Sequence, residues 1–263
     1  RFMKFDKLLD FAFAHGLNYI VTGHYARIER DENTGRYLLK KGVDEGKDQS
    51  YVLYNLTQHQ LAHTIFPLGA YSKTQIREMA EQQGFCNARK HDSQDICFVP
   101  DGDYVGFMEQ YTGKRYPSGD FIDESGKKIG THAGAVRYTI GQRRGLGLPM
   151  GDRVYVCAKD MEKNTVTVGP VESLFATRVI VRDMNWISVP ELTGEMRVKA
   201  KLRYRQKEQP AVASPLDGGR ILLTFDEPQR GPAIGQAAVL YDGDTVVGGG
   251  TICGVPKDGE VCR

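Results

Sequence analysis

Residues 19–24 read YIVTGH, and this short run gives the clearest indication of how the chain folds. Before it, apolar residues recur at helical spacing over residues 2–13, and Gly16 follows where the end of a helix favours a left-handed residue. The run itself predicts a short buried strand that ends at a Gly-His pair. A helix that leads into such a strand is typical of an α/β sheet, where ligands bind beyond the carboxyl ends of the strands.

The α/β pattern continues along the chain. Residues 36–39 read RYLL and predict another strand. Two helix starts fit the capping box, in which the first and fourth side chains bond each other's exposed backbone amides. The second helix is expected to stop at Gly84. We therefore assign residues 1–99 to one α/β domain. The two capping boxes pair Thr57 with Gln60 and Ser72 with Gln75.

Glycine becomes frequent after residue 100, and long helical patterns disappear. Residues 119–134 predict short strands and turns, and residues 141–147, GQRRGLG, predict a mobile basic loop. We therefore expect a small, mostly β domain over residues 100–170. Residues 171–263 show several strand patterns separated by Gly, Asp and Pro turns, which is typical of a small barrel or sandwich. The expected fold class is α/β followed by β. Strands of the middle domain are expected at 154–157 and 165–168.

The composition is that of an ordinary globular protein. Of 263 residues, 40% are hydrophobic and 26% charged, and no apolar run approaches the ~18 residues of a membrane span. The net charge of +2 means that any nucleic-acid binding must come from local patches. The five cysteines include no C-x-x-C pair and no zinc spacing, which argues against a disulfide scaffold and a metal site. We expect a reducing cytoplasm, with free thiols at Cys86, Cys97, Cys157, Cys253 and Cys262.

Residues 197–207 read RVKAKLRYRQK and carry the clearest charge pattern in the chain. Six cations occupy alternate positions, so in one continuous strand they would all point one way, along roughly 30 Å. We call this predicted feature the basic rail. A polyanion such as nucleic acid would relieve the repulsion among its charges. The alternative is a solvated face that pairs with acidic residues on a neighbouring strand, and Tyr204 fits either a base-stacking platform or the core.

Cys97 lies in residues 92–99, DSQDICFV, at the junction between the helical and the glycine-rich regions, where loops often carry function. The thiolate is the reactive form of cysteine, and the cations at residues 89–91 would favour it, whereas the two nearby aspartates oppose it. A buried structural cysteine is the commoner alternative. His24, after the first strand, is either a ligand-facing residue or a satisfied surface histidine. Residues 47–51, KDQSY, fit a contact loop or a polar turn.

Several segments, taken together and in order, resemble one protein family. They are residues 19–25, 47–51, 92–98 and 139–147, followed by 203–205, 225–228 and 235–236. The ordered set is similar to the tRNA-specific 2-thiouridylases, bacterial enzymes that thiolate the wobble uridine of certain tRNAs. The resemblance spans essentially the whole chain. It implies a Rossmann-like ATP-pyrophosphatase domain over residues 1–99, a small central domain, and a C-terminal β-barrel over residues 171–263 that contacts tRNA.

The resemblance also implies a reaction. ATP, with Mg²⁺, adenylates the C2 oxygen of the uridine, a protein persulfide delivers sulfur, and AMP leaves. Adenylation makes the oxygen a good leaving group, and a persulfide is a good nucleophile. A cysteine desulfurase or a relay protein would donate the sulfur. By motif matching, Cys97 corresponds to the persulfide cysteine and Gly23 to a residue that contacts ATP. The residues that match the family's tRNA contacts are His24, Lys47, Asp48, Gln49, Arg203, Tyr204 and Gln236.

The chain departs from the family pattern at its amino end. The family's Ser-Gly-Gly-x-Asp-Ser phosphate loop and its first catalytic cysteine are absent, and Arg1 opens onto a helical pattern without a secretory signal. We therefore expect a chain that begins inside a domain and lacks turnover on its own. Two other functions stay open. One is a tRNA-binding module in which Cys97 is buried; the other is an ATP-pyrophosphatase-type transferase that acts on a small molecule.

Overall fold

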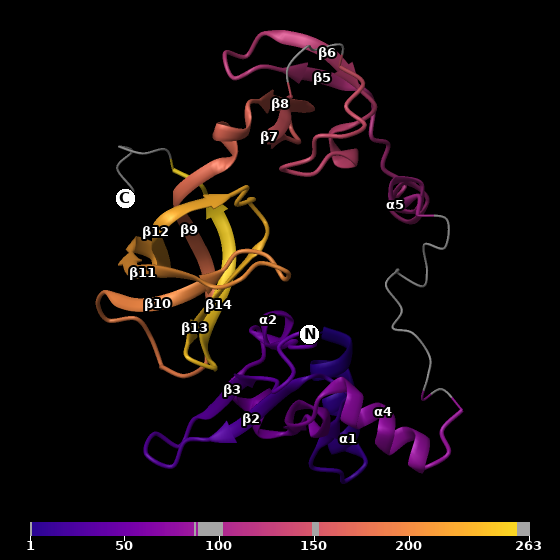
Figure 1. Cartoon of the computed structure of the whole chain (residues 1–263), viewed down its shortest axis with the longest axis vertical. Coiled ribbons are helices and arrows are strands. Elements are labelled where there is room, and N and C mark those ends of the chain that lie inside the picture. Colours follow the sequence, from indigo (N-terminus) through magenta and orange to yellow (C-terminus); the bar gives the residue numbers. More distant parts are fainter. Residues whose placement is uncertain (1, 87, 89–101, 149–152, 257–263) are drawn as a thin grey trace. The chain divides into compact units, whose positions relative to one another are not determined.

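The computed structural model describes residues 2–86, 88, 102–148 and 153–256. Contacts gather the chain into two compact units. The elements of both units are labelled in Figure 1. The division of the chain into three domains at the predicted boundaries stays a prediction. Unit 1 comprises residues 1–90, 177–227 and 234–263, and unit 2 comprises residues 91–176 and 228–233.

The first part of unit 1 is the predicted α/β segment. A π-helix, η1 (Phe2–Lys7), leads into α1 (Leu8–Ala14), and Gly16 has a φ of 74° just after α1 ends. The strand β1 (Ile20–Val21) follows and pairs in parallel with β4 (Thr64–Ile65). Parallel strands need a crossover connection between them, which is the hallmark of an α/β arrangement. The helix, its left-handed end and the strand are therefore confirmed, but the strand is not buried along its length, because Ile20 is buried and Val21 is 63% exposed.

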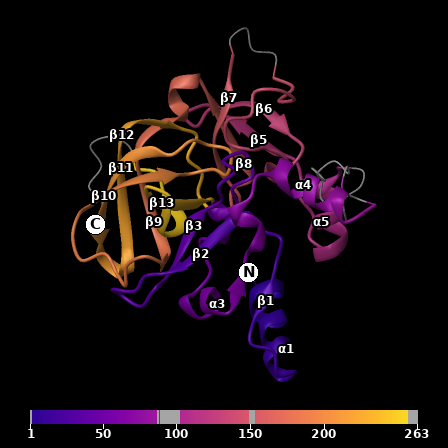
Figure 2. The same ribbon diagram turned by 60° about the horizontal axis from the view of Figure 1, so that its bottom comes forward.

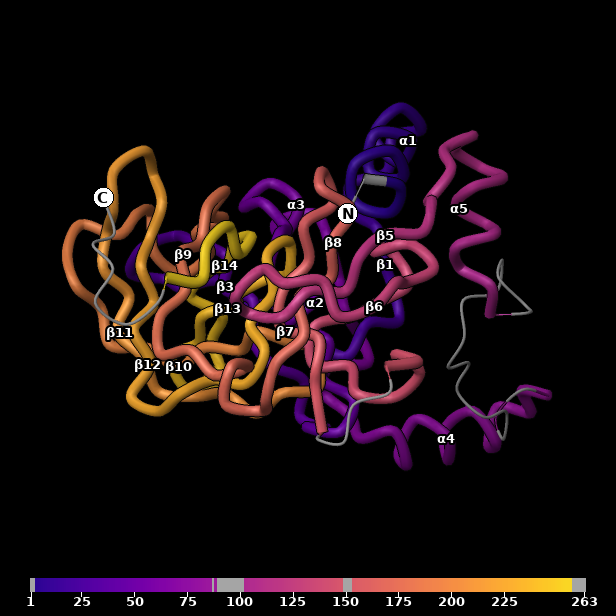
Figure 3. Tube along the Cα trace, turned by 90° about the horizontal axis from the view of Figure 1, so that it is seen from above, coloured from indigo at the N-terminus to yellow at the C-terminus, as the bar shows by residue number. Residues whose placement is uncertain are grey.

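Both predicted capping boxes form. Thr57 caps α3 (Gln58–Ala62) and Ser72 caps α4 (Lys73–Gln82), each with a reciprocal bond from the glutamine three residues on. Gly84 follows α4 with a φ of 71°, as expected for the residue that stops this helix. Figure 3 shows α1 and α4 well apart in unit 1. Two short helical elements lie between the strands: α2 (Ser50–Leu53) and η2 (Pro67–Ala70).

The second part of unit 1 is a closed six-stranded β-barrel (Figure 1). Its strands are ordered β13-β10-β11-β12-β9-β14, and β14 pairs with β13 to close the barrel. Val179, Leu223 and Leu240 are among the fully buried side chains of its core. The barrel confirms the all-β prediction. Its strands are β9 (Phe175–Trp186), β10 (Met196–Lys201), β11 (Gln209–Leu216), β12 (Arg220–Arg230), β13 (Ala237–Asp242) and β14 (Thr245–Gly254), with η5 (Asp217–Gly219) before β12.

The α/β segment continues the barrel sheet. The strand β3 (Tyr37–Lys41) pairs with β14 at Lys40 and Thr245, and β2 (Ala26–Arg30) pairs with β3. Figure 2 shows β2 next to β3. The two parts also share one core, because Leu39 and Leu56 pack in the same buried cluster as Tyr241 of β13. This shared core places the loop that follows β3 next to the barrel.

Unit 2 contains a four-stranded sheet of order β6-β5-β8-β7, in which β5 and β8 are parallel. Phe121, Val156 and Val166 are fully buried in its core. Asn164, at the bend predicted between the last two strands, has a φ of 51°. The predicted short strands are therefore confirmed. They are β5 (Gly119–Ile122), β6 (Lys128–His132), β7 (Tyr155–Asp160) and β8 (Thr165–Gly169), with the 3₁₀ turns η3 (Ala135–Arg137) and η4 (Val171–Leu174).

Unit 2 also contains a helix that the sequence did not predict, α5 (Tyr104–Thr112). The Asp103 side chain caps it by accepting the Gly106 amide at 3.1 Å. Val105 is the only described residue of α5 that is buried. The apolar residues Tyr104, Phe107, Met108 and Tyr111 follow helical spacing, a signal that the sequence analysis did not use. No helix in the described part of the chain, α5 included, is long and apolar enough to cross a membrane.

Candidate functional site

Gly23 and His24 lie at the carboxyl end of β1. The ladder with β4 extends one residue past β1, because the Thr22 amide donates to the Ile65 carbonyl at 3.1 Å. A Cβ at Gly23 would meet only the Leu68 Cδ1 atom, at 3.5 Å, which is an ordinary contact. The described fold therefore has room for a side chain at Gly23. Packing in the described part of the chain therefore does not explain the glycine, and its role as an ATP contact stays a prediction.

His24 is half-buried between two aromatic rings. Its ring centre lies 5.7 Å from that of Phe5 and 5.6 Å from that of Phe66. Its Nδ1 atom lies 2.8 Å from the Thr22 hydroxyl. Burial lowers the pKa of His24, and the positive charge of Lys4 lowers it further. The imidazole is therefore neutral at pH 7, and Nε2 is the ring nitrogen that faces no described hydrogen-bond partner.

Residues 44–49 form a loop that is hydrogen-bonded to Tyr25, the residue that follows His24. The Gln49 amide donates to the Tyr25 carbonyl at 2.9 Å, and the Gln49 side-chain oxygen accepts the Tyr25 amide at 3.0 Å. The Asp44 carboxylate fixes the other end of the loop by accepting the Lys73 amide at 2.8 Å. This reciprocal pairing brings the loop beside the strand end described above.

Asp48 organises this loop from within. Its carboxylate accepts the amides of Gly42 and Ser50, each at 3.1 Å, and the Ser50 hydroxyl at 2.8 Å. Because a carboxylate only accepts, the Ser50 hydrogen points to Asp48, and the Tyr241 hydroxyl, 3.2 Å from Ser50 Oγ, must donate to it. Burial raises the pKa of Tyr241, which keeps that proton in place. The Asp48 side chain is therefore committed to holding the loop.

The turn after β10 brings Arg203 and Tyr204 to the same loop. β10 ends at Lys201, and the Gln206 amide closes the turn by donating to the Arg203 carbonyl at 3.1 Å. The Tyr204 hydroxyl donates to the Asp48 carbonyl at 3.2 Å, although the two residues are 156 positions apart. Tyr204 is 44% exposed, and its ring centre lies 6.0 Å from that of Tyr51.

Two lysines and two tyrosines form a cluster next to this turn. The Lys201 Nζ atom lies 5.9 Å from the ring centres of both Tyr51 and Tyr241, and the Lys41 Nζ atom lies 4.8 Å from that of Tyr241. Lys41 also forms an ion pair with Glu208 at 2.7 Å. Burial raises the pKa of Tyr51 to about 12, so its hydroxyl stays protonated. Sequence reasoning missed Lys41 and Tyr241, which carry no local motif and join the loop only through the fold.

Gln236 adjoins the same cluster through its neighbour Ala237. The Tyr51 hydroxyl donates to the Ala237 carbonyl at 2.9 Å. The Gln236 carbonyl accepts the Ile252 amide at 2.8 Å, and the Gln236 residue is exposed. Hydrogen bonds and ring contacts thus connect the loop, the turn after β10 and the neighbour of Gln236, and Tyr25 places Gly23 and His24 beside the loop along the chain. The described candidate residues in unit 1 therefore come from four segments. These residues are Gly23, His24, Lys47, Asp48, Gln49, Arg203, Tyr204 and Gln236.

The basic rail does not form, and this prediction was wrong. β10 supplies only Arg197, Lys199 and Lys201 to one face, because the chain turns over residues 202–208 and returns as β11. Arg197 forms a two-pronged ion pair with Asp226, with one of the two bonds at 2.7 Å. The alternative of a surface strand paired with acidic residues therefore holds for this arginine. Tyr204 lies in the turn and is exposed, which excludes it from the core.

Cys97 lies outside the residues that the structure describes, as does Cys262. Its role as the persulfide cysteine therefore stays a prediction. The described cysteines, Cys86, Cys157 and Cys253, are free thiols, and Cys86 is exposed. Burial raises the pKa of Cys157, which lowers its thiolate fraction at neutral pH. Among the described residues, no group of three His, Cys, Asp or Glu side chains is placed to hold a metal ion.

Three family models match the chain in order. They are described as a tRNA methyl transferase HUP domain over residues 1–101, a tRNA methyl transferase PRC-barrel domain over residues 105–170, and an aminomethyltransferase beta-barrel domain over residues 176–252. With the closed barrel, these matches confirm the predicted fold class. It comprises a Rossmann-like α/β part, a small β-rich central part and a C-terminal β-barrel.

Curated relatives match at high identity over most of the chain. The tRNA-specific 2-thiouridylase MnmA 1 of Thermoanaerobacter sp. strain X514 is 50% identical over 96% of this chain and 69% of its own length. The tRNA-specific 2-thiouridylase MnmA of Acetivibrio thermocellus is 48% identical over 96% of this chain and 70% of its own length. That of Clostridioides difficile strain 630 is 47% identical, over 95% and 69%. The chain therefore belongs to the family of tRNA-specific 2-thiouridylases.

Proposed function

We propose that this protein is a tRNA-modifying enzyme that replaces the C2 oxygen of the wobble uridine with sulfur, giving 2-thiouridine. The observation that carries the proposal is the hydrogen-bonded network of unit 1, which joins Gln49 to Tyr25 and Tyr204 to Asp48. This network gathers residues that the family resemblance assigned to tRNA from separate segments of the chain. The names of relatives that are 47% to 50% identical support the same activity.

Charge and stacking support tRNA as the substrate. Lys47, Arg203 and Arg205 bring three cations to one loop and one turn, and arginine matches the geometry of a phosphate. The Tyr204 ring is 44% exposed and offers a face on which a base can stack. The wobble base normally stacks within the anticodon loop and must turn out to reach a thiol. Stacking on Tyr204 would offset part of the free energy lost when the loop opens.

In the proposed reaction, the uridine C2 oxygen attacks the α-phosphate of ATP and pyrophosphate leaves. The terminal sulfur of a persulfide on Cys97 then attacks C2, and the oxygen departs as part of AMP. A second thiolate attacks the Cys97 sulfur and breaks the S–S bond, which leaves sulfur on the base and a disulfide on the protein. A dithiol reduces that disulfide, and a cysteine desulfurase or relay protein then restores the persulfide.

Two residues at the end of β1 have defined parts in this proposal. Gly23 presents a backbone without a side chain, where a phosphate-bearing substrate can come close. His24 is neutral at pH 7 because burial lowers its pKa, so it bonds the RNA as a hydrogen-bonding group rather than as a cation. With Nδ1 beside the Thr22 hydroxyl, Nε2 is the atom that would contact the substrate.

The test is formation of 2-thiouridine in a tRNA transcript supplied with ATP and a persulfide donor. The protein would carry this chain within a polypeptide of the length of its relatives. Wild type is compared with Cys97→Ser and with Cys86→Ser, because Cys86 is an exposed thiol without a part in the proposed chemistry. We expect thiouridine from the wild type and from Cys86→Ser, and none from Cys97→Ser.

Each other outcome points to a different function. Thiolation that survives Cys97→Ser would keep the enzyme but remove Cys97 from its centre. Salt-dependent tRNA binding without thiouridine in the wild type would indicate a tRNA-binding module. If tRNA does not bind at all, a transferase that acts on a small molecule becomes the better reading of the α/β domain.

A further inference from the structure

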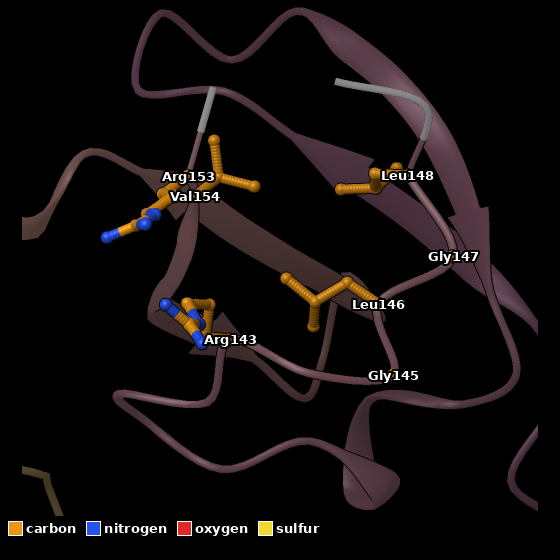
Figure 4. A pocket seen from close by; sticks show the side chains of 7 residues that line it. All are labelled: Arg143, Gly145, Leu146, Gly147, Leu148, Arg153 and Val154. Carbon is orange, nitrogen blue, oxygen red and sulfur yellow. The ribbon is translucent and has the colours of Figure 1, made fainter. Parts of the chain in front are cut away.

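The glycine-rich loop of residues 141–147 has no part in the proposed reaction, yet it borders a cavity in unit 2. The cavity has a volume of about 410 Å³. Arg143 and Arg153 line one side of it, with Val154 beside Arg153, and Leu146 and Leu148 line the other (Figure 4). This division into a cationic and an apolar side suggests a ligand with two chemically different ends. The apolar side chains are Leu146, Leu148 and Val154.

Hydrogen bonds tie the loop in place. The Gln142 side-chain oxygen accepts the Thr139 amide at 3.0 Å, and its nitrogen donates to the Arg144 carbonyl at 3.0 Å. The Gln142 carbonyl accepts the Val156 amide at 2.9 Å, and the Gly141 amide donates to the Val156 carbonyl at 2.8 Å. The loop is therefore fastened both to itself and to β7, so Arg143 projects from a defined backbone.

The apolar side of the cavity is part of the unit 2 core. Leu146 is 8% exposed and packs in the same cluster as Val156. Leu148 lies directly on the backbone of β6, because a Cβ at Gly130 would come within 2.4 Å of the Leu148 Cδ2 atom. A side chain at residue 130 would push Leu148 out of the wall. Glycine at this position therefore leaves room for Leu148 in the cavity wall.

The two arginines on the cationic side do not help to hold the described part of the fold together. Both are exposed, and neither forms an ion pair or hydrogen bond with another described residue. They contrast with Arg137 of the same unit, which bonds the Ala133 carbonyl at 3.1 Å and faces Asp103 at 3.9 Å. Uncommitted guanidinium groups beside one cavity are suited to an anion, and phosphate matches their fork of donors.

We propose that this cavity binds one unpaired nucleotide of the tRNA, with its phosphate on Arg143 and Arg153 and its base against Leu146, Leu148 and Val154. The inference rests on the proposed function, which supplies tRNA as the substrate. An apolar wall suits the face of any base, and unpaired nucleotides are the ones whose faces are free. The next described element after the loop is the strand β7, so no helix N-terminus adds the field that favours a free nucleoside triphosphate.

The test measures binding of a fluorescently labelled tRNA to the full chain over a series of salt concentrations. The double variant Arg143→Ala/Arg153→Ala is expected to bind about tenfold more weakly, and its salt slope is expected to fall by about 0.7, the value for one single-stranded phosphate. Val154→Ser trims the apolar wall without changing charge, so affinity should fall roughly threefold at an unchanged slope. Lys163→Ala removes an exposed cation of unit 2 that pairs with Asp160, and should change neither quantity.

Four results would overturn the proposal in whole or in part, and the first two separate it from the proposed function. Unchanged binding by the arginine double variant, with weaker binding by Arg203→Ala/Arg205→Ala, would remove the cavity and keep the tRNA function. No tRNA binding by the wild type would remove both. An arginine double variant that loses affinity for ATP but not for tRNA would assign the cavity to a free nucleotide. If Val154→Ser has no effect, the site recognises phosphate alone and the base contact is wrong.

Discussion

The loop of residues 44–51 in unit 1 and the loop of residues 141–147 in unit 2 both carry cations, but they use their polar groups differently. In unit 1, the side chains of Asp48 and Gln49 accept hydrogen bonds from backbone amides. The Tyr204 hydroxyl, from the barrel, donates to the Asp48 carbonyl. In unit 2, Arg143 reaches a cavity with no described partner. Hydrogen bonds hold both loops in shape, but the second loop also presents an arginine, Arg143, that has no described partner and can meet a ligand.

This difference separates stability from binding. A polar group that satisfies buried amides cannot be removed without leaving those amides unpaired, so mutation there should lower stability first. A guanidinium that contacts only water costs the fold little when it is removed, so mutation there should lower affinity alone. The single tryptophan, Trp186 of β9, gives a fluorescence signal for the unfolding of unit 1.

The largest expected effect on the unit 1 loop is that of Asp48→Ala. The change leaves the buried amides of Gly42 and Ser50 without an acceptor, and we expect the free energy of unfolding to fall by about 3 kcal/mol. Urea titration followed by Trp186 fluorescence measures this. Asp226→Ala removes an exposed aspartate of the barrel and should cost less than ~0.5 kcal/mol. If the two variants lose equal stability, Asp48 does not organise the loop.

The double variant Arg203→Ala/Arg205→Ala should weaken tRNA binding by about tenfold, because each arginine is expected to contribute one phosphate contact. Its salt slope should fall by about 1.4 to 1.8 in total, with little change in stability. A series of tRNA titrations at different salt concentrations measures the affinity and the salt slope. Urea titration of Trp186 fluorescence measures the stability. Binding that stays at the wild-type level would show that the turn after β10 does not touch RNA.

Two histidines, one in each unit, should make stability depend on pH in the same direction. Burial lowers the pKa of both His24 and His132 below 6.5. His132 is 2% exposed, and its Nδ1 atom accepts the Gly134 amide at 3.0 Å, so protonating that atom would break a buried bond. The unfolded chain therefore binds more protons, and stability is present above pH 6.5 and lost as the pH falls through the folded pKa values.

Proton NMR titration of the histidine rings measures both pKa values directly, with His24→Gln and His132→Gln to assign the signals. Thermal melting at pH 7.0 and 5.5 should show a loss of stability that shrinks in either variant. A pKa at or above 6.5 for His132 would mean that its ring is not buried as described. The result also bears on His24 in the proposed reaction, because a protonated ring there would contact RNA as a cation.

Much of the fold could be predicted because its signals are local. The capping boxes at Thr57 and Ser72 are complete within four residues, and both form. The barrel strands β10 and β11 show the alternation that a half-buried strand requires, whereas β13 and β14 are continuous buried runs. The helix α5 was not predicted although Tyr104, Phe107, Met108 and Tyr111 follow helical spacing, because the run is short and lies in a glycine-rich segment.

The site could be predicted only in part, since its contacts are not local. Motif order supplied the candidates, but no pattern shows that Tyr204 bonds Asp48 or that Lys41 lies over Tyr241. The basic rail was wrong because residues 202–208, LRYRQKE, contain neither glycine nor proline to mark the turn. The charged residues keep alternating through the turn, so the sequence looks like one continuous strand although the strand ends at Lys201. Alternation predicts which way side chains point only while the backbone stays extended.

The smallest expected effect therefore tests the corrected geometry. Arg197→Ala removes a cation of the former rail that is already paired with Asp226 on the barrel surface. An exposed pair contributes about 0–1 kcal/mol, so stability should change by less than ~0.5 kcal/mol, and tRNA affinity should stay within about twofold of wild type. The rail would predict a loss equal to that of Arg203→Ala, since its charges were equivalent. Equal losses for the two arginines would mean that RNA binding pulls Arg197 away from Asp226 and uses the strand as well as the turn. Unequal losses would confine the phosphate contacts to the turn, where Tyr204 ties the barrel to the loop.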